Sequence, residues 1–192
     1  MTEKRPHQQG SAAPQNPRSS GRRGGGLVEF LVICLVAFAL VFGLVRPFIV
    51  EAFYIPSESM VPTLQVGDRV FVNKFIYRFH EPNRGDVVVF KGVEGQDEDL
   101  IKRVVGLPGD QIEVRDGVLY VNGERQEEPY VNPDLPDRSS YGPTTVPEGS
   151  FFAMGDNRAD SRDSRFFGAV PFEKIEGEAF VVFWPPTHVR LL

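Results

Sequence analysis

The stretch LIKRVVGLPGDQIEVRDGVLYVNGERQ, residues 100–126, decides the fold class. Its short apolar runs are separated by turn-forming dipeptides at 108–109, 116–117 and 122–123. Asp-Gly and Asn-Gly between alternating hydrophobic residues are the strongest short-range signals for tight β-hairpins. The stretch therefore predicts a meander of short strands.

Similar apolar runs, bounded by turn formers, extend this pattern over the chain beyond residue 50. Five prolines between residues 127 and 147 predict a long irregular excursion after the hairpins. We therefore expect a protein of the mainly β class. Its all-β domain covers residues 51–192, with a small hairpin-rich cap inserted at about 111–149. The other expected strands lie at residues 70–72, 87–90, 101–105, 151–154 and 179–183.

The composition limits the chain to about one folded domain with an appendage. Of its 192 residues, 41% are hydrophobic and 24% are charged, as in an ordinary globular protein. The net charge of −5 provides no basic surface for phosphates, so no nucleic acid is expected as a partner. The single cysteine, Cys34, excludes an internal disulfide and a thiolate zinc cluster.

A basic leader stands before the rest of the chain. Residues 1–26 contain five basic residues and one acidic residue, a net charge of +4, and almost no apolar side chains. Such a segment buries too little apolar surface to fold. We therefore expect residues 1–26 to form a disordered leader in the cytoplasm.

The next segment, residues 27–50, is apolar, and its only charges are Glu29 and Arg46 near the two ends. As a helix it is about 36 Å long, against roughly 30 Å of bilayer hydrocarbon. A cleaved signal peptide and a buried core helix are the alternatives, but no small-residue cleavage pattern follows the apolar run. We expect a single-pass anchor in the lipid bilayer, with the acidic remainder of the chain outside.

The sequence offers little support for histidine or metal chemistry. His7 lies in the leader, while His80 and His188 lie in loop-like segments where surface or structural roles are expected. The zinc motif HExxH, glycine-rich nucleotide loops and EF-hand loops do not occur in the sequence. We expect no metal and no cofactor, so an enzyme of this sequence needs another nucleophile and another base.

Two segments offer a hydroxyl and an amine. In FYIPSESMVPTL, residues 53–64, prolines on both sides of Ser59 restrict the backbone and suit a rigidly held hydroxyl, although a plain juxtamembrane turn has the same composition. Strand alternation places Lys102 and Arg103 on opposite faces, so one of them meets the less solvated side unless both lie on an edge strand. A buried lysine has a lowered pKa and can accept a serine proton, as in Ser-Lys enzymes.

A third segment, residues 154–171, is rich in turn formers, hydroxyls and carboxylates, as a solvated loop is. With all three segments considered, the chain resembles the bacterial type I signal peptidases, membrane-anchored serine proteases that remove signal peptides from secreted proteins. The matching motifs follow the family's order: PSESMVPTL at 56–64, GDRV at 67–70, RGDVVVF at 84–90, IKRVVGLPGD at 101–110 and GDNRADSRDSR at 155–165.

The resemblance implies the reacting groups. It implies that Ser59 is the nucleophile and that Lys102 is the general base. It also implies that the Ser57 hydroxyl joins the backbone N–H of Ser59 in the oxyanion hole. The fold implied is a membrane-associated all-β domain built around this Ser-Lys site, in agreement with the strand pattern.

The resemblance further implies supporting residues. Ser161 is expected to hydrogen-bond Lys102 and orient its amine. Asp163 and Arg165 are expected to brace the site through an ion pair that also lies near Arg103. Only 45 positions separate the lysine motif from GDNR, so the cap is expected to be smaller than the second domain of some members.

The resemblance and the anchor together imply a place of action and a substrate. The expected location is the bacterial inner or plasma membrane, with the N-terminus cytoplasmic and the catalytic domain on the outer, periplasmic face. Ser59 follows residue 50 by nine positions, which limits its distance from the bilayer to about 30 Å. Shared confinement favours substrates in the same membrane, so the expected partners are precursors that carry signal peptides.

Two other hypotheses remain open. One is another Ser-Lys peptidase of similar fold, such as a self-cleaving repressor, which the spanning segment and the absence of DNA-binding features disfavour. The other is an anchored extracytoplasmic binding or scaffolding module without activity. The presence of both Ser59 and Lys102 counts against this second hypothesis.

Overall fold

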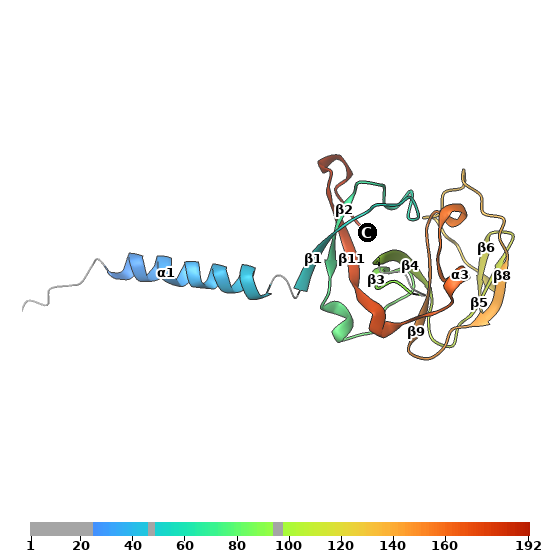
Figure 1. The fold of residues 1–192 in the computed structure, drawn as a ribbon, viewed down its shortest axis with the longest axis horizontal. Coiled ribbons are helices and arrows are strands. Elements are labelled where there is room, and N and C mark those ends of the chain that lie inside the picture. Colours follow the sequence, from blue (N-terminus) through green and yellow to red (C-terminus); the bar gives the residue numbers. More distant parts are fainter. Residues whose placement is uncertain (1–24, 46–48, 94–97) are drawn as a thin grey trace, which may run out of the picture. The chain divides into compact units, whose positions relative to one another are not determined.

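The computed structural model describes residues 25–45, 49–93 and 98–192. The chain divides into an N-terminal unit that ends at Ala39 and a second unit from Leu40 to Leu192. Helix α1 spans Gly25–Leu40 and continues as a π-helical turn over Val41–Val45 (Figure 1). The predicted leader lies almost wholly outside the described residues.

Apart from Glu29 near its start, helix α1 is apolar on all sides. The window Gly26–Gly43 has a mean hydropathy of 2.6, and none of it is buried inside the protein. Such a helix is long and apolar enough to cross a membrane, which fits the expected anchor. The expected anchor ends too late, however, because Val50 already pairs with Asn73 as the first residue of a strand.

The main sheet of the second unit has eight antiparallel strands in the order β1-β2-β11-β3-β4-β9-β10, with β12 beside β11. Each apolar run that was expected to form a strand lies in this sheet or in the second one. The sheet is strongly curled, as Figure 1 shows. Its strands are β1 (Val50–Tyr54), β2 (Arg69–Asn73), β3 (Val87–Phe90), β4 (Leu100–Gly106), β9 (Ser150–Met154), β10 (Val170–Pro171), β11 (Ile175–Trp184) and β12 (Arg190–Leu191).

A second sheet forms from the hairpin-rich part of the sequence. Asp116 and Gly117 both have positive φ, as do Asn122 and Gly123, which is the backbone that two-residue hairpin turns require. The sheet falls within the range expected for the cap and lies beside β9 in Figure 1. Its order is β7 (Glu124–Arg125), β6 (Val118–Val121), β5 (Gln111–Arg115) and β8 (Tyr141–Thr145).

Helices in the described residues beyond position 49 are short, so the expectation of a mainly β domain with one N-terminal helix is confirmed. They follow the turn-rich segments between strands. The longest, α3, covers one turn at Ser164–Phe167. The others are 3-10 turns: η2 (Ile76–Arg78), η3 (Arg158–Asp160), η4 (Phe172–Lys174) and η5 (Pro186–His188).

The second sheet attaches to the main sheet through an apolar cluster. Phe152 and Met154 of β9 are fully buried against Ile112, Val114 and other apolar side chains of the hairpins. The ring of Phe152 also lies 5.4 Å from that of Tyr141 in β8. Burying a phenylalanine side chain contributes roughly 2 to 3 kcal/mol, so this cluster fixes the second sheet on the first.

We expect Phe152→Ala to lower the free energy of unfolding by about 3 to 5 kcal/mol, because it leaves a cavity between the two sheets. Phe166→Ala is the matched control, since that ring is 68% exposed, and it is expected to cost less than about 1 kcal/mol. Denaturant unfolding of the full chain in detergent micelles measures both. Equal costs for the two variants would show that the sheets do not depend on this cluster.

Candidate active site

The loop between β1 and β2 positions Ser59 at the edge of the core. Ile55 and Met60 on either side of it are buried in the core cluster of the main sheet, and they fix the loop to the domain. The amide of Leu64 donates to the carbonyl of Met60 at 2.8 Å, which closes a tight turn just after the serine. Ser59 itself is 7% exposed, so its side chain is largely shielded from solvent.

Lys102 lies in the interior of the main sheet. Its strand, β4, is hydrogen-bonded to β3 on one side and to β9 on the other, so the edge-strand alternative is wrong. The side chain is 3% exposed, and its Nζ lies 2.7 Å from the Oγ of Ser59 and 2.9 Å from the carbonyl oxygen of Ile101. The fold thus brings together two groups that are 43 residues apart in the sequence.

Burial prepares the amine of Lys102 to act as a base. Desolvation of its charged form lowers the pKa of Lys102 from 10.5 to about 8, against the opposing effect of the Asp163 and Asp156 carboxylates. At pH 7, an amine with a pKa near 8 is neutral roughly 300-fold more often than one with a pKa of 10.5. The neutral amine can accept the proton of the hydroxyl that it contacts.

Ser57 lies on the exposed side of the same loop. Its Oγ is 3.4 Å from the Oγ of Ser59, so the two hydroxyls point into the same region. An oxyanion formed at Ser59 would therefore develop beside a second hydroxyl. This arrangement suits the donor role that the resemblance implies for Ser57.

The hydrogen bond expected between Ser161 and Lys102 is absent from the part of the chain that the structure describes. The Oγ of Ser161 is buried and has no hydrogen-bond partner among the described residues. The hydroxyl packs instead against the backbone of Gly155: a Cβ at Gly155 would lie 2.3 Å from it and 2.4 Å from the Ser59 carbonyl oxygen. The close approach of these backbones leaves room only for glycine at position 155.

The expected ion pair between Asp163 and Arg165 is present. Nε of Arg165 donates to the Asp163 carboxylate at 2.9 Å, and the same carboxylate accepts the amide of Gly155 at 3.0 Å. Arg165 also donates to the carbonyl oxygen of Arg158 at 2.7 Å. The pair therefore ties α3 to the loop that begins at Gly155.

Arg103 forms its own ion pair, with a residue that the sequence motifs did not single out. Its guanidinium donates to both carboxylate oxygens of Asp156, at 2.9 and 2.7 Å, and not to Asp163. The expectation placed Arg103 near the Asp163–Arg165 pair and named no partner for it. Asp156 becomes that partner because it lies two residues after the end of β9, and β9 pairs with β4 so that Arg103 lies opposite Met154. The GDNR motif contains Asp156, but the motif does not reveal which residue Asp156 pairs with.

Asn157 is a second residue that sequence reasoning missed. Its amide N–H donates to the carbonyl oxygen of Ser59 at 3.0 Å, and its side-chain Nδ2 donates to the carbonyl of Glu58 at 3.2 Å. The loop with GDNR thus contacts the backbone of the nucleophile loop directly. A turn-rich composition does not reveal such a contact between segments 98 residues apart.

The two histidines of the described domain lie in other contacts. His188 Nδ1 is 2.7 Å from the Oδ1 of the buried Asp68, and His80 Nδ1 is 3.0 Å from the carbonyl oxygen of Glu81. Among the residues that the structure describes, no group of three His, Cys, Asp or Glu side chains could hold a metal ion. The arrangement that remains is a serine hydroxyl held against a buried lysine amine.

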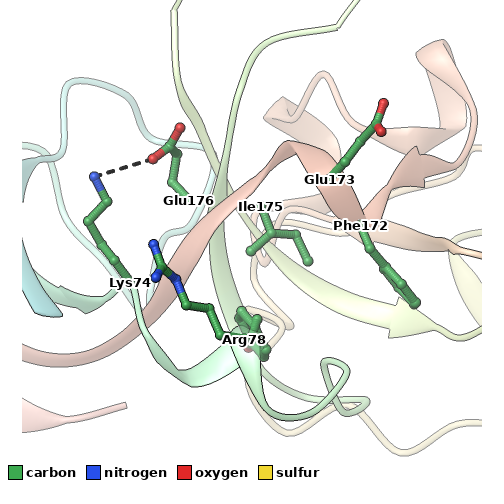
Figure 2. A pocket seen from close by; sticks show the side chains of 7 residues that line it. Lys74, Arg78, Phe172, Glu173, Ile175 and Glu176 are labelled. Atoms are coloured by element: carbon green, nitrogen blue, oxygen red, sulfur yellow. Dashed lines mark ion pairs between the residues drawn. The ribbon is translucent and has the colours of Figure 1, made fainter. Parts of the chain in front are cut away.

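A cavity of about 390 Å³ elsewhere on the domain does not belong to this site. Its lining combines basic and acidic side chains, among them Lys74, Arg78, Glu173 and Glu176. Figure 2 shows Lys74 directed toward Glu176, with 3.5 Å between Nζ and Oε2. Because these charges offset one another and neither member of the Ser-Lys pair lines the cavity, it offers no counterpart to the chemistry at Ser59.

Comparison with known proteins places the chain in a family. The model of the family described as signal peptidase, peptidase S26, matches residues 27–184. A probable signal peptidase I-2 of Synechocystis sp. is 45% identical over 153 residues, which cover 77% of this chain and 69% of the relative. Signal peptidase I of Leptolyngbya laminosa is 42% identical over 187 residues and 91% of each chain.

A solved structure is also similar. The signal peptidase I of Enterococcus faecalis V583 is 34% identical, covers 52% of this chain and 97% of its own, and has a TM-score of 0.44. The family match covers the apolar helix and most of the β domain, including all five motifs. The chain therefore belongs to the signal peptidase family, peptidase S26.

Proposed function

We propose that Ser59 and Lys102 perform the peptide-bond hydrolysis by which the protein removes signal peptides from precursor proteins. The observation that carries this assignment is the 2.7 Å contact between Lys102 Nζ and Ser59 Oγ inside a buried site. A serine hydroxyl becomes a nucleophile when an adjacent base accepts its proton. The neutral amine of Lys102 takes the place that histidine has in a Ser-His-Asp triad.

The proposed reaction proceeds through an acyl-enzyme. Neutral Lys102 accepts the Ser59 proton as Oγ attacks the scissile carbonyl carbon, and the developing oxyanion accepts hydrogen bonds from the Ser59 N–H and the Ser57 hydroxyl. The protonated amine then donates its proton to the leaving amine, and the peptide bond breaks. Lys102 next removes a proton from a water molecule that attacks the ester, and it returns that proton to Ser59 Oγ.

The remaining site residues are proposed to support this pair. Asp163 with Arg165, and Arg103 with Asp156, place two charge-compensated ion pairs around the lysine. Their carboxylates keep the pKa of Lys102 from falling further, since a negative charge nearby favours the protonated amine. Ser161 is proposed to orient Lys102, as the resemblance implies, and its buried hydroxyl has no hydrogen-bond partner among the described residues that would compete for it.

The setting proposed for this reaction is the outer face of a bacterial plasma membrane. The basic residues 1–26 favour a cytoplasmic N-terminus by the positive-inside rule, and α1 would then carry the chain across the bilayer. A precursor whose signal peptide lies in the same bilayer reaches Ser59 at a raised effective concentration. The alternative of an anchored scaffold without activity is not favoured, because the relatives are peptidases by name.

The first test compares Ser59→Ala, Lys102→Met and Ser57→Ala in full-length protein with a membrane-inserted precursor. We expect the first two variants to lose cleavage almost completely, because each removes a reacting group. Ser57→Ala is expected to lower kcat by about 10²- to 10³-fold through loss of one oxyanion donor. Lys91→Met, at a side chain that is 67% exposed, is the matched control with full activity. Cleavage by Ser59→Ala at the wild-type rate would disprove the assignment.

The second test follows the rate of cleavage against pH. The base acts when neutral, so kcat/KM is expected to rise with pH along an acid limb with its midpoint near pH 8. Asp163→Asn removes a charge that raises the pKa of Lys102, so the midpoint is expected to move to lower pH. Asp160→Asn, at an exposed position in the same loop, is the control that leaves the midpoint unchanged. An acid limb near pH 6 in the wild type would indicate a different base.

The third test measures the cost of the buried amine. Below pH 8 the lysine is protonated in both the folded and the unfolded chain, and burial of its charge destabilises the fold; this penalty falls as pH rises from about 8 to 10.5. Lys102→Met is therefore expected to raise the free energy of unfolding at pH 7 by about 2 to 3 kcal/mol. The gain is expected to shrink by pH 10. A Met variant no more stable than the wild type at pH 7 would contradict a costly burial.

A further inference from the structure

The proline-rich segment after β7 reaches across to the loop that supports the active site. We name residues 126–139 the brace segment and residues 155–165 the support loop. The brace segment contacts the support loop and β4 through three arginine side chains. The contacts are Glu128 with Arg158, Tyr130 with Arg103, and Asp137 with Arg165.

The first contact is a nearly buried ion pair. The Glu128 carboxylate accepts both Nη groups of Arg158, with 2.7 Å between Nη1 and Oε2, and the two side chains are 10% and 1% exposed. Nε of Arg158 also donates to the carbonyl oxygen of Gly155 at 2.9 Å. An unpaired charge is costly to bury, so Arg158 holds this position only while Glu128 compensates it.

The second contact continues from the same carboxylate. The hydroxyl of Tyr130 donates to Glu128 Oε1 at 2.9 Å, and its ring lies 4.1 Å below the guanidinium carbon of Arg103. Arg103 in turn binds both oxygens of Asp156. Tyr130 therefore limits the movement of the arginine that fixes Asp156, through a cation–π contact and packing.

The first contact holds Arg158 directly, and the second holds Asp156 through Arg103. Asn157 lies between Asp156 and Arg158, and its N–H holds the carbonyl oxygen of Ser59 at 3.0 Å. Its Nδ2 holds the carbonyl of Glu58. Both neighbours of Asn157 are thus fixed from the brace segment, while Asn157 itself fixes the backbone of the nucleophile.

We propose that Glu128 and Tyr130 are positioning residues for signal-peptide cleavage, acting by holding residues 156–158 against the backbone of Ser59. The inference rests on the proposed role of Ser59. Neither side chain touches the reacting atoms; both act through the arginines. A displacement of reacting groups by about 1 Å can lower a rate by about 10²-fold, so loss of this restraint should reduce turnover even in a folded enzyme.

The test compares kcat and KM for a signal-peptide precursor in detergent micelles, with each rate normalised to the folded fraction from circular dichroism. Glu128→Gln and Tyr130→Leu are expected to lower kcat at least tenfold while KM stays within twofold. Tyr130→Phe keeps the ring on Arg103 and loses only the hydroxyl, so a loss of about threefold is expected. Glu127→Gln makes the same charge change at an exposed neighbour and is expected to leave kcat unchanged.

The combination of variants separates a positioning role from a purely structural one. Because both residues act on the same three positions, the Glu128→Gln, Tyr130→Leu double variant should lose less than the product of the single losses. Wild-type kcat in the folded fraction of Glu128→Gln and Tyr130→Leu would overturn the inference, as would losses that appear only in KM. Ser59→Ala in the same assay tests the proposed function separately: if it is inactive while both brace variants are fully active, only the positioning role fails.

Discussion

The site depends on keeping one amine out of water beside one hydroxyl. Lys102 achieves this because its strand lies between two others and its side chain points into the domain. Burial lowers the pKa of Lys102, but two nearby carboxylates limit this lowering because they favour the protonated amine. The opposing effects leave an amine that can both remove and return a proton near neutral pH, which a deeper or a more exposed lysine could not do equally well.

The carboxylates near this amine are themselves compensated. Asp156 pairs with Arg103 and Asp163 pairs with Arg165, so the site contains fixed ion pairs in place of unpaired charges. Such pairs add little net stability when buried, but they fix geometry because removal of either partner leaves a costly charge. Stability comes mainly from the apolar clusters, whereas the ionic contacts hold the loop that contains Asn157, whose N–H donates to the Ser59 carbonyl.

Local signals in the sequence predicted the central strands of the main sheet and the hairpins, and the motifs pointed to the two groups that are proposed to react. The dipeptides after residues 115 and 121 predicted the two hairpins, because their backbone needs residues that tolerate positive φ. The family motifs pointed to Ser59 and Lys102, which the structure brings into contact.

Contacts between distant segments could not be predicted from the sequence. Whether β4 lies at an edge depends on the pairing of β9, which returns after about 45 residues. The same pairing decides that Arg103 meets Asp156, and residue type and spacing do not reveal it. The hydrogen bond from Asn157 to the Ser59 carbonyl depends on how two loops meet, and so does the lack of a partner for the Ser161 hydroxyl among the described residues. The end of the apolar helix depends on where β1 begins to pair with β2.

The order of strands has a consequence for how Ser59 and Lys102 are brought together. Strand β11, formed by Ile175–Trp184, lies between β2 and β3, and it alone joins the strand pair β1-β2 to the strands β3-β4-β9-β10 in the described sheet. Strand β11 follows both Ser59 and Lys102 in the sequence. The strands next to these two residues are therefore joined by inter-strand hydrogen bonds only after this later segment has been inserted between them.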